Sequence, residues 1–372
     1  MNVPFCNFNA QMEAYKQEMM EAIGNVLDSG QFIQGQAVKD LEIKLAKYTG
    51  AKHALTCANG TDALTITMKA LGVNQGDEVI LPAFTYFATA ETISDLGAVP
   101  VFVDVGEDFQ INPVEVRKAV TEKTRAIIVV SLFGFLPHCE ELLEISKEFD
   151  IPIIEDGAQS FGAVRNGVQS CSFATISTTS FFPTKPLACY GDGGALFTDC
   201  DELASKIRLL RNHGQSKKYT HISIGQNSRL DTVQAAVLMI KLKHFENEID
   251  SRRDIAKRYI AKLKEVSQIQ LPNSHGLQDQ DGVWAQFTIR TKSRDKLVAH
   301  LNAKGIPTAI HYPKPVYKQL AYSDSSNNPF RKLNCPVSEE LSRTVLSLPI
   351  CAFTRREDQN TVLAEVKSFF NQ

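Results

Sequence analysis

The stretch from residue 125 to residue 156, RAIIVVSLFGFLPHCEELLEISKEFDIPIIED, decides the fold class of this chain. It begins with an apolar run at 125–131 and ends with a second apolar run at 151–156. Between them, residues 138–149 place apolar side chains at helical spacing. Short continuous runs of valine and isoleucine separated by a helix are typical of parallel strands that are covered on both faces. The stretch therefore predicts an α/β fold with a parallel or mostly parallel sheet.

The same alternation extends on both sides of this stretch. Further apolar runs predict strands at residues 78–82, 99–105, 175–182 and 193–198. Helical spacing predicts a lead-in helix at 12–27, a helix after Gly60, and helices at 86–96 and 113–120. We therefore expect a large α/β/α sheet domain with a lead-in segment before it.

The chain changes character after a long helical stretch that runs from Asp231 to about Lys264. Residues 266–282 are polar and rich in turn formers, and a short low-complexity loop lies at 323–328. We expect strands at 283–290 and 307–312, and helices at 294–303, 338–345 and 356–370. For a chain of 372 residues, this pattern predicts a large domain at 1–250 and a small C-terminal α+β domain at 251–372.

Composition and charge exclude several functional classes for this chain. Lys and Arg total 40 against 42 Asp and Glu, so the chain lacks the basic excess expected for a partner of nucleic acid or anionic membrane. None of the eight cysteines is paired at the C-x₂₋₄-C spacing of zinc ribbons, and we expect no metal site. Scattered thiols, the lack of a signal-peptide pattern and of an apolar run near ~20 residues favour a cytoplasmic protein.

Two candidate ligand positions combine a turn with an acid or a hydroxyl. Gly60 and Thr61 open directly into a predicted helix, whose free N–H groups and dipole favour a phosphate; the alternative is an ordinary helix cap. Asp156 ends a fully apolar strand, with Gln159 three residues later. A buried carboxylate needs a cation or several donors, and a protonated pyridine nitrogen is one such partner. The alternative for Asp156 is a cap on the next helix.

Two further positions present basic side chains. Lys185 follows Ser180 in a segment of aromatic and small residues, between two prolines and before the glycines of 191–194. A lysine that is desolvated there becomes a nucleophile able to form a Schiff base, whereas the alternative is a lysine on a solvated loop. Arg229, in the polar loop 225–231, can grip a diphosphate or carboxylate, or else form an ion pair with Asp231.

These segments, taken in order, resemble the DegT/StrS-type sugar-nucleotide aminotransferases over nearly the whole chain. The matching motifs are NGTDAL at 59–64, EDGAQ at 155–159, SFFPTK at 180–185 with GDGG at 191–194, and NSRLD at 227–231. The resemblance implies the aspartate-aminotransferase-like fold (fold type I), pyridoxal 5′-phosphate (PLP) as cofactor, and a homodimer with shared active sites.

The resemblance also implies a role for each matching position. Lys185 matches the catalytic lysine that carries PLP, Asp156 the acid at the pyridine nitrogen, and Gln159 the amide beside the ring hydroxyl. Gly60, Thr61 and Ser180 match the residues that surround the phosphate of the cofactor. Asn227 matches the residue that reaches this phosphate from the neighbouring subunit, and Tyr86 matches the aromatic residue that stacks on the ring. Positions near the nucleotide sugar match Arg229, His311 and Tyr312.

The implied reaction transfers an amine from an amino acid, expected to be L-glutamate, to a nucleotide-linked keto sugar. Relatives with histidine at the lysine position dehydrate, so Lys185 favours transamination. Pro186 replaces the usual asparagine, and FFPTKPL at 181–187 looks most like the branch that aminates carbon 3 of UDP-2-acetamido-2-deoxy-3-oxo-glucuronate, in lipopolysaccharide or other surface polysaccharide biosynthesis. Alternatives are amination at carbon 4 of a dTDP- or UDP-4-keto-6-deoxy sugar, and a PLP-binding regulatory protein without turnover.

Overall fold

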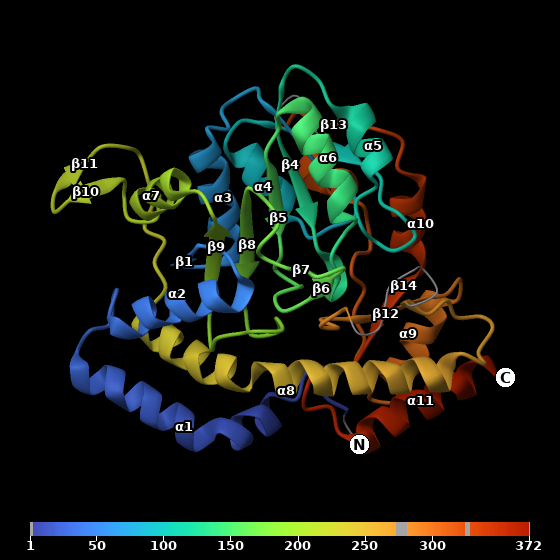
Figure 1. The fold of residues 1–372 in the computed structure, drawn as a ribbon. Helices are drawn as coiled ribbons and strands as arrows, with labels where there is room; N and C mark the ends of the chain where they lie inside the picture. The colour runs from blue at the N-terminus through green and yellow to red at the C-terminus, as the bar shows by residue number, and fades with distance from the viewer. Residues whose placement is uncertain (1–2, 273–280, 324–327, 372) are drawn as a thin grey trace.

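A computed structural model of the chain describes residues 3–272, 281–323 and 328–371 (Figure 1). An eight-stranded sheet lies at its centre, in the order β1-β9-β8-β5-β4-β2-β3-β13. From one edge to the other these strands are β1 (His53–Cys57), β9 (Gly194–Thr198), β8 (Ile176–Ser180), β5 (Ile153–Asp156), β4 (Thr124–Val130), β2 (Glu78–Pro82), β3 (Val99–Val103) and β13 (Arg331–Lys332). Only the pairings of β9 with β1 and with β8 are antiparallel within this sheet. The predicted mostly parallel sheet is confirmed.

Alternate residues of the central strands pack on opposite faces of the sheet, which explains their continuous apolar runs. Val79 and Leu81 of β2 belong to one core with α3 (Gly60–Leu71) and α4 (Ala88–Asp95). Ile80, between them, belongs to a second core with α5 (Pro113–Ala119) and α6 (Cys139–Phe149). Since successive side chains of a strand point to opposite faces, a strand covered on both sides needs apolar residues throughout.

The register of the central strands brings their polar ends together. Val130 of β4 lies opposite Asp156 of β5, and Asp156 lies opposite Thr178 of β8. Ser180, at the end of β8, pairs with Gly194 of β9. The carboxyl ends of parallel strands meet at one edge of a sheet, and this is the edge where open α/β sheets bind ligands.

A long helix connects the two ends of the molecule. In Figure 1, α8 (Thr232–Leu263) runs below the sheet. Helices α1 (Phe8–Ser29) and α2 (Gln36–Thr49) contact its first half, and α11 (Arg356–Phe370) contacts its second half. The first half of α8, with Phe245, packs into the core under the sheet, and its second half, with Tyr259, packs into the C-terminal core. Residue 250, the predicted division, therefore lies inside a continuous helix, and the division stays a prediction.

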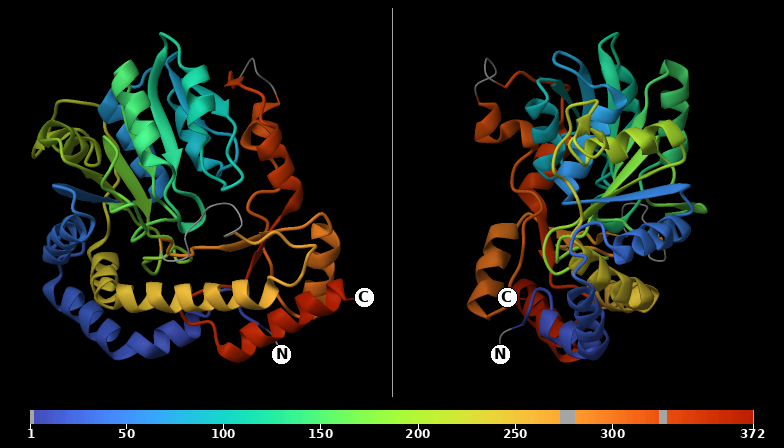
Figure 2. Two further views of the ribbon diagram at one scale, coloured as in Figure 1. Left: turned by 45° about the vertical axis from the view of Figure 1, so that its right-hand side comes forward. Right: turned by 90° about the vertical axis from the view of Figure 1, so that its left-hand side faces the viewer.

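The C-terminal part is built around an antiparallel pair, β12 (Phe287–Arg290) and β14 (Val345–Leu348), whose core includes α9 (Arg294–Ala303) and α11. Helix α10 (Pro336–Thr344) leads directly into β14. Val3 packs into the same core and its N–H donates to Gly305 O, so the two ends of the chain lie near each other (Figure 2). Strand β13 leaves this region and pairs with β3 at the edge of the large sheet. The sequence did not predict this return of the chain to the large sheet.

Several shorter elements lie in the described ranges. These are α7 (Asp201–Leu210), the two-residue to three-residue strands β6 (Val164–Arg165), β7 (Val168–Gln169), β10 (Gln215–Lys217) and β11 (Thr220–His221), and the 3₁₀ turns η1 (Leu132–Gly134), η3 (Val316–Lys318) and η4 (Leu320–Tyr322). Over the described ranges, no helix combines the length and apolar character needed to cross a membrane.

One predicted strand is wrong. Residues 307–312 form only a single bridge, between Ala309 and Ser347, instead of a strand. Pro307 and Pro313 at the two ends of this segment cannot donate to a ladder, which limits pairing to the residues between them. The predicted loops at 266–282 and 323–328 fall partly on residues 273–280 and 324–327, which lie outside the described residues.

Candidate active site

A cavity of about 660 Å³ opens at the carboxyl edge of the central strands. Most of the predicted site residues line it: Gly60, Thr61, Tyr86, Asp156, Gln159, Ser180, Lys185, His311 and Tyr312. They come from segments as far apart in sequence as α3 and the loop after residue 307, so the fold gathers them at one place. Asn227 and Arg229 do not line this cavity.

Asp156 is held by donors on both carboxylate oxygens. Ala158 N–H donates to Oδ1 at 3.2 Å, and Thr89 Oγ1 of α4 donates to Oδ2 at 3.0 Å. Burial raises the pKa of the Asp156 carboxyl, and the nearby Lys185 amine, the Ala158 N–H and the Thr89 hydroxyl act against that rise. Residues 157–163 form turns and no helix starts there, so the interpretation of Asp156 as a helix cap is wrong.

Lys185 lies on a tight loop between β8 and β9. Phe181 N–H donates to Gly193 O, Cys189 N–H donates to Phe181 O and Lys185 N–H donates to Phe182 O, each at 2.8 Å. These bonds close the loop and leave the Lys185 side chain at the cavity wall. Burial lowers the pKa of the Lys185 amine, against the opposing effect of the Asp156 charge. The interpretation of Lys185 as a lysine on a solvated loop is therefore wrong, and burial favours the neutral, nucleophilic form of its amine.

The start of α3 lies against Ser180 at the end of β8. Asn59 caps the helix, because its Oδ1 accepts from Asp62 N–H at 2.7 Å. A Cβ placed on Gly60 would lie 2.7 Å from the Ser180 Cβ, so only glycine allows this approach. The free N–H groups of the first turn and the hydroxyls of Thr61 and Ser180 therefore gather at one end of the cavity, as a phosphate requires.

Gln159 is fixed at both ends of its amide. Phe133 N–H donates to its Oε1 at 2.8 Å, and its Nε2 donates to the Tyr312 hydroxyl at 3.1 Å. Phe133 adopts a left-handed conformation, with φ of 59°, that turns its N–H toward Gln159. This amide therefore joins the loop after β4 to the C-terminal part of the chain.

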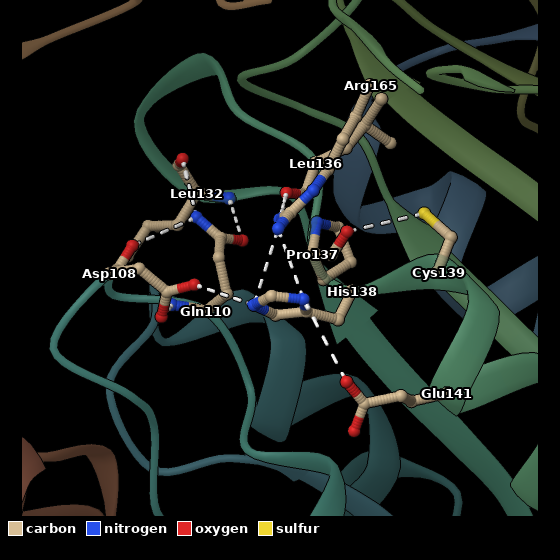
Figure 3. A network of polar contacts seen from close by, with 9 residues as sticks. All are labelled: Asp108, Gln110, Leu132, Leu136, Pro137, His138, Cys139, Glu141 and Arg165. Atoms are coloured by element: carbon tan, nitrogen blue, oxygen red, sulfur yellow. Dashed lines mark hydrogen bonds and ion pairs between the residues drawn. The ribbon is translucent and has the colours of Figure 1, made fainter. Parts of the chain in front are cut away.

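A polar network behind this loop holds it in place (Figure 3). Gln110 Nε2 donates to Leu132 O at 3.2 Å, and its Oε1 accepts from Leu132 N–H at 3.4 Å. Arg165 Nη1 donates to Leu136 O at 2.9 Å, and its Nη2 lies 3.1 Å from His138 Nδ1. The loop after β4, which contacts Gln159 through Phe133, is thus also held by Gln110 and Arg165.

Aromatic and imidazole rings form another wall of the cavity. The rings of Tyr86 and Tyr312 lie 6.3 Å apart, and 61% of Tyr86 is exposed. Burial raises the pKa of the Tyr312 hydroxyl, which therefore stays protonated. Burial, aided by the Lys185 charge, lowers the pKa of His311 to about 4. His311 is therefore neutral at physiological pH and adds no positive charge beside Lys185.

Arg229 and Asn227 lie on the loop before α8. Arg229 Nη1 donates to Asn212 Oδ1 at 2.8 Å, and the ion pairs of the described chain do not include one with Asp231. Asn227 forms a backbone bridge with Asn212. The role of Asn227 in a neighbouring subunit and that of Arg229 near the sugar stay predictions.

Some polar residues of the site were not predicted. Thr89 donates to Asp156, Gln286 lines the cavity, and Ser347 lies 2.9 Å from His311 Nδ1. Thr85 and Thr89 are four residues apart, on either side of the start of the predicted helix at 86–96, and their hydroxyl oxygens lie 3.2 Å apart. That spacing was an available signal for Thr89, whereas Gln286 and Ser347 carry no comparable local pattern.

The residues of the cavity fit PLP. Asp156 would hold the ring nitrogen, Lys185 the aldehyde carbon, and Gly60, Thr61 and Ser180 the phosphate. The fit rests on three observations: a buried acid, an amine of lowered pKa in the same cavity, and a helix start too crowded for a Cβ. In the part of the chain that the structure describes, no cluster of three or more His, Cys, Asp or Glu side chains is arranged to hold a metal ion.

The chain matches a known family over most of its length. The model of the DegT/DnrJ/EryC1/StrS aminotransferase family matches residues 13–367. A Pseudomonas aeruginosa protein named UDP-2-acetamido-2-deoxy-3-oxo-D-glucuronate aminotransferase is 46% identical over 94% of this chain and 95% of its own length. A Streptomyces venezuelae protein named dTDP-3-amino-3,4,6-trideoxy-alpha-D-glucose transaminase is 39% identical over 99% of this chain and 96% of its own.

Solved structures show the same fold. The structure of DesV from S. venezuelae has a TM-score of 0.95 and 39% identity, covering 100% of this chain and 99% of that one. The structure of NtdA from Bacillus subtilis with bound cofactor PMP has a TM-score of 0.91 and 29% identity, covering 100% of this chain and 86% of that one.

Proposed function

The chain belongs to the DegT/DnrJ/EryC1/StrS aminotransferase family of PLP-dependent enzymes, and we propose that it aminates carbon 3 of UDP-2-acetamido-2-deoxy-3-oxo-glucuronate with L-glutamate as donor. The observation that carries the enzyme class is the pairing, in one cavity, of a lysine of lowered pKa with a buried acid. The choice of sugar is supported by the 46% identity to the P. aeruginosa protein.

The half-reaction with the amino donor requires a proton acceptor and groups that hold the cofactor. When bound, PLP supplies an electron sink for the charge left as the donor Cα proton is removed. Lys185, whose pKa is lowered by burial, accepts that proton and returns it in the same half-reaction. Asp156, held by Ala158 and Thr89, supplies the negative charge that keeps the ring nitrogen protonated. Gln159 beside the ring hydroxyl and Tyr86 against the ring face complete the proposed binding site.

We place the nucleotide sugar against the C-terminal wall of the cavity, where His311 and Tyr312 lie. Arg229 would meet an acidic group of the sugar nucleotide, because guanidinium groups bind carboxylates and phosphates in a bidentate manner. A homodimer would bring Asn227 of a second copy to the phosphate. This proposal accounts for the position of Asn227 and Arg229 outside the cavity of one chain.

A second substrate class is a dTDP-linked keto sugar, which the name of the S. venezuelae relative favours. Amination at carbon 4 of a 4-keto-6-deoxy sugar has less support, because the names of both relatives refer to carbon 3. A regulatory protein without turnover has less support than an enzyme, because Lys185 and Asp156 are both present and lie in one cavity.

We place the enzyme in the cytoplasm, in surface polysaccharide biosynthesis. All eight cysteines are free thiols, which suits a reducing compartment. We also propose a cofactor domain at 1–250 and a smaller domain at 251–372, joined through α8, whose two halves pack in different cores.

A substrate panel tests the proposed function. PLP-loaded protein is incubated with L-glutamate and one of three sugars: the UDP-linked 3-oxo-uronate, a dTDP-3-keto-6-deoxy sugar, or a UDP-4-keto-6-deoxy sugar. The release of 2-oxoglutarate is then measured, with Lys185→Ala as the matched inactive control. We expect the highest kcat/KM with the 3-oxo-uronate. Turnover with the 4-keto sugar alone would overturn the carbon 3 assignment, and a cofactor that never responds to glutamate would overturn the enzyme class.

A further inference from the structure

His311 is the first member of a short chain of hydrogen bonds that leads to two buried hydroxyls. Its Nδ1 lies 2.9 Å from the Ser347 Oγ, and the Ser347 Oγ lies 2.9 Å from the Thr288 Oγ1. Ser347 is 0% exposed and Thr288 is 2% exposed, so neither hydroxyl has access to bulk water. The other ring nitrogen of His311, Nε2, has no hydrogen bond within residues 3–272, 281–323 and 328–371, and the ring lines the cavity.

The backbone fixes the positions of these hydroxyls. Thr288 and Ser347 lie directly opposite each other in the pairing of β12 with β14. Ser347 N–H donates to Ala309 O at 2.8 Å, and Ala309 N–H donates to Ser347 O at 3.2 Å, which ties the His311 loop to the same strand. Because the contact is built on a strand pair and a backbone bridge, the ring orientation follows from the fold.

Counting donors decides the direction of the hydrogen bonds. If His311 carried its proton on Nδ1, that N–H would donate to Ser347, and either the Ser347 or the Thr288 hydroxyl hydrogen would have no acceptor among the contacts of the described residues. If instead Thr288 donates to Ser347 and Ser347 donates to Nδ1, each hydroxyl hydrogen has an acceptor. A buried donor without an acceptor is costly, so the second arrangement is favoured. It leaves the single proton of the neutral ring on Nε2.

We propose that Thr288 and Ser347 form a hydroxyl relay that holds His311 as the Nε2–H tautomer, so that the ring presents a neutral hydrogen-bond donor to an oxygen atom of the sugar substrate. Ser347 and Thr288 are positioning residues, since they act through His311. The relay itself is independent of the proposed function, and only the identity of the acceptor rests on it.

The neutral state of the donor matters at this place. Lys185 lies close enough for its charge to act on His311, and the Tyr312 ring lies 5.8 Å from the His311 ring. A positively charged imidazolium here would repel the protonated Lys185 amine and so lower the tendency of that amine to be protonated. A neutral N–H aligns an uncharged or anionic oxygen of the sugar and leaves the proton equilibrium of Lys185 undisturbed.

The direct test is the ¹⁵N spectrum of the histidine side chains in the full-length, PLP-loaded protein, with His311 assigned by its loss in His311→Gln. We expect a protonated Nε2 and an unprotonated Nδ1 that accepts a hydrogen bond at neutral pH. In Ser347→Ala, the Nδ1 signal should move toward that of an unbonded nitrogen, and Thr288→Val should move it less in the same direction. Ser342→Ala, which removes a buried hydroxyl bonded only to Ser338 O, is the matched control. A proton on Nδ1, or a charged ring, would overturn the relay.

Kinetics then test the contact with substrate. Ser347→Ala should raise the KM for the keto sugar about tenfold, with kcat and the half-reaction with glutamate changed less than about twofold. His311→Gln, whose amide nitrogen can occupy the place of Nε2, should retain more sugar affinity than His311→Asn. Equal KM values in Ser347→Ala and Ser342→Ala would overturn the donor role. If no keto sugar is turned over, the proposed function fails, while the ¹⁵N spectra still decide the relay.

Discussion

Gly60→Ala tests whether the start of α3 and Ser180 hold a phosphate. The added Cβ would lie 2.7 Å from the Ser180 Cβ and 3.2 Å from its Oγ. The Ser180 Cβ is one bond from the backbone of β8, so it cannot rotate away, and α3 or β8 has to shift. Overpacking of this kind costs about 1–3 kcal/mol, of which the lower chain entropy of alanine offsets about 0.4–1 kcal/mol.

The effect on cofactor affinity follows from the same displacement. If the shift removes one N–H bond to the phosphate, the loss is about 1.5–3 kcal/mol, because the acceptor is charged. This loss corresponds to an increase of about 10-fold to 150-fold in the Kd for PLP. The net free energy of unfolding of the cofactor-free protein should fall by about 1–2 kcal/mol.

The assay is a titration of cofactor-free protein with PLP, followed by absorbance, together with urea unfolding. Gly24→Ala is the matched control, because nothing lies within 4 Å of its added Cβ and the residue is within α1. This control should leave the Kd unchanged and stabilise the protein by about 0.5–1 kcal/mol. A Gly60→Ala protein that is destabilised but binds PLP with wild-type affinity would refute the placement of the phosphate at this helix start.

Three further predictions concern the lysine, the histidine and the core. Lys185→Ala should lose the absorbance band of the lysine-bound cofactor, and retention of the wild-type band would show that another residue carries PLP. Because the pKa of His311 in the folded protein is about 4 against an ordinary 6.5, the unfolded chain binds the proton more readily. Unfolding free energy should therefore fall by about 3 kcal/mol as the pH drops from 6.5 to 4, and urea unfolding of His311→Gln should lack this part of the pH dependence. Phe161→Ala should lower the unfolding free energy by about 3–5 kcal/mol, since the ring is 1% exposed and packs against Phe181, Phe197 and Phe245; a urea midpoint near wild type would contradict that packing.

Periodic patterns made most of the sheet predictable from the sequence. The strand expected at 78–82 appears as β2 with the same bounds, because an apolar run covered on both faces leaves a direct signature. The long helix expected from Asp231 to Lys264 appears as α8, Thr232–Leu263. Such elements are specified by their own residues, so a single sequence is enough to find them.

Elements that depend on distant partners were less predictable. The segment 307–312 looks like a strand, yet within the described residues it forms a single β-bridge, between Ala309 and Ser347. Helix α2, Gln36–Thr49, was not predicted, although it places Val38, Leu41 and Leu45 in the core at helical spacing. Strand β13 pairs with β3 over two residues, too short a segment to leave a period in the sequence.

The candidate site divides in the same way. Asp156 was a candidate because it ends an apolar strand, and Lys185 because it lies among aromatic and small residues between two prolines; the cavity contains both. Thr89, Thr288 and Ser347 were not predicted, because a threonine or serine is unremarkable until its partner is known. Thr288 and Ser347 come together through the pairing of β12 with β14, and no local sequence pattern predicts which strands will pair.

The central claim is that this chain transfers the amine of glutamate to carbon 3 of a nucleotide-linked keto sugar. The most direct test supplies PLP-loaded protein with L-[¹⁵N]glutamate and UDP-2-acetamido-2-deoxy-3-oxo-glucuronate, and locates the label by NMR of the recovered sugar nucleotide. We predict ¹⁵N bonded to carbon 3, one 2-oxoglutarate released for each amine transferred, and no transfer with Lys185→Ala. A label that remains entirely in glutamate, with the keto sugar unchanged, would contradict the claim.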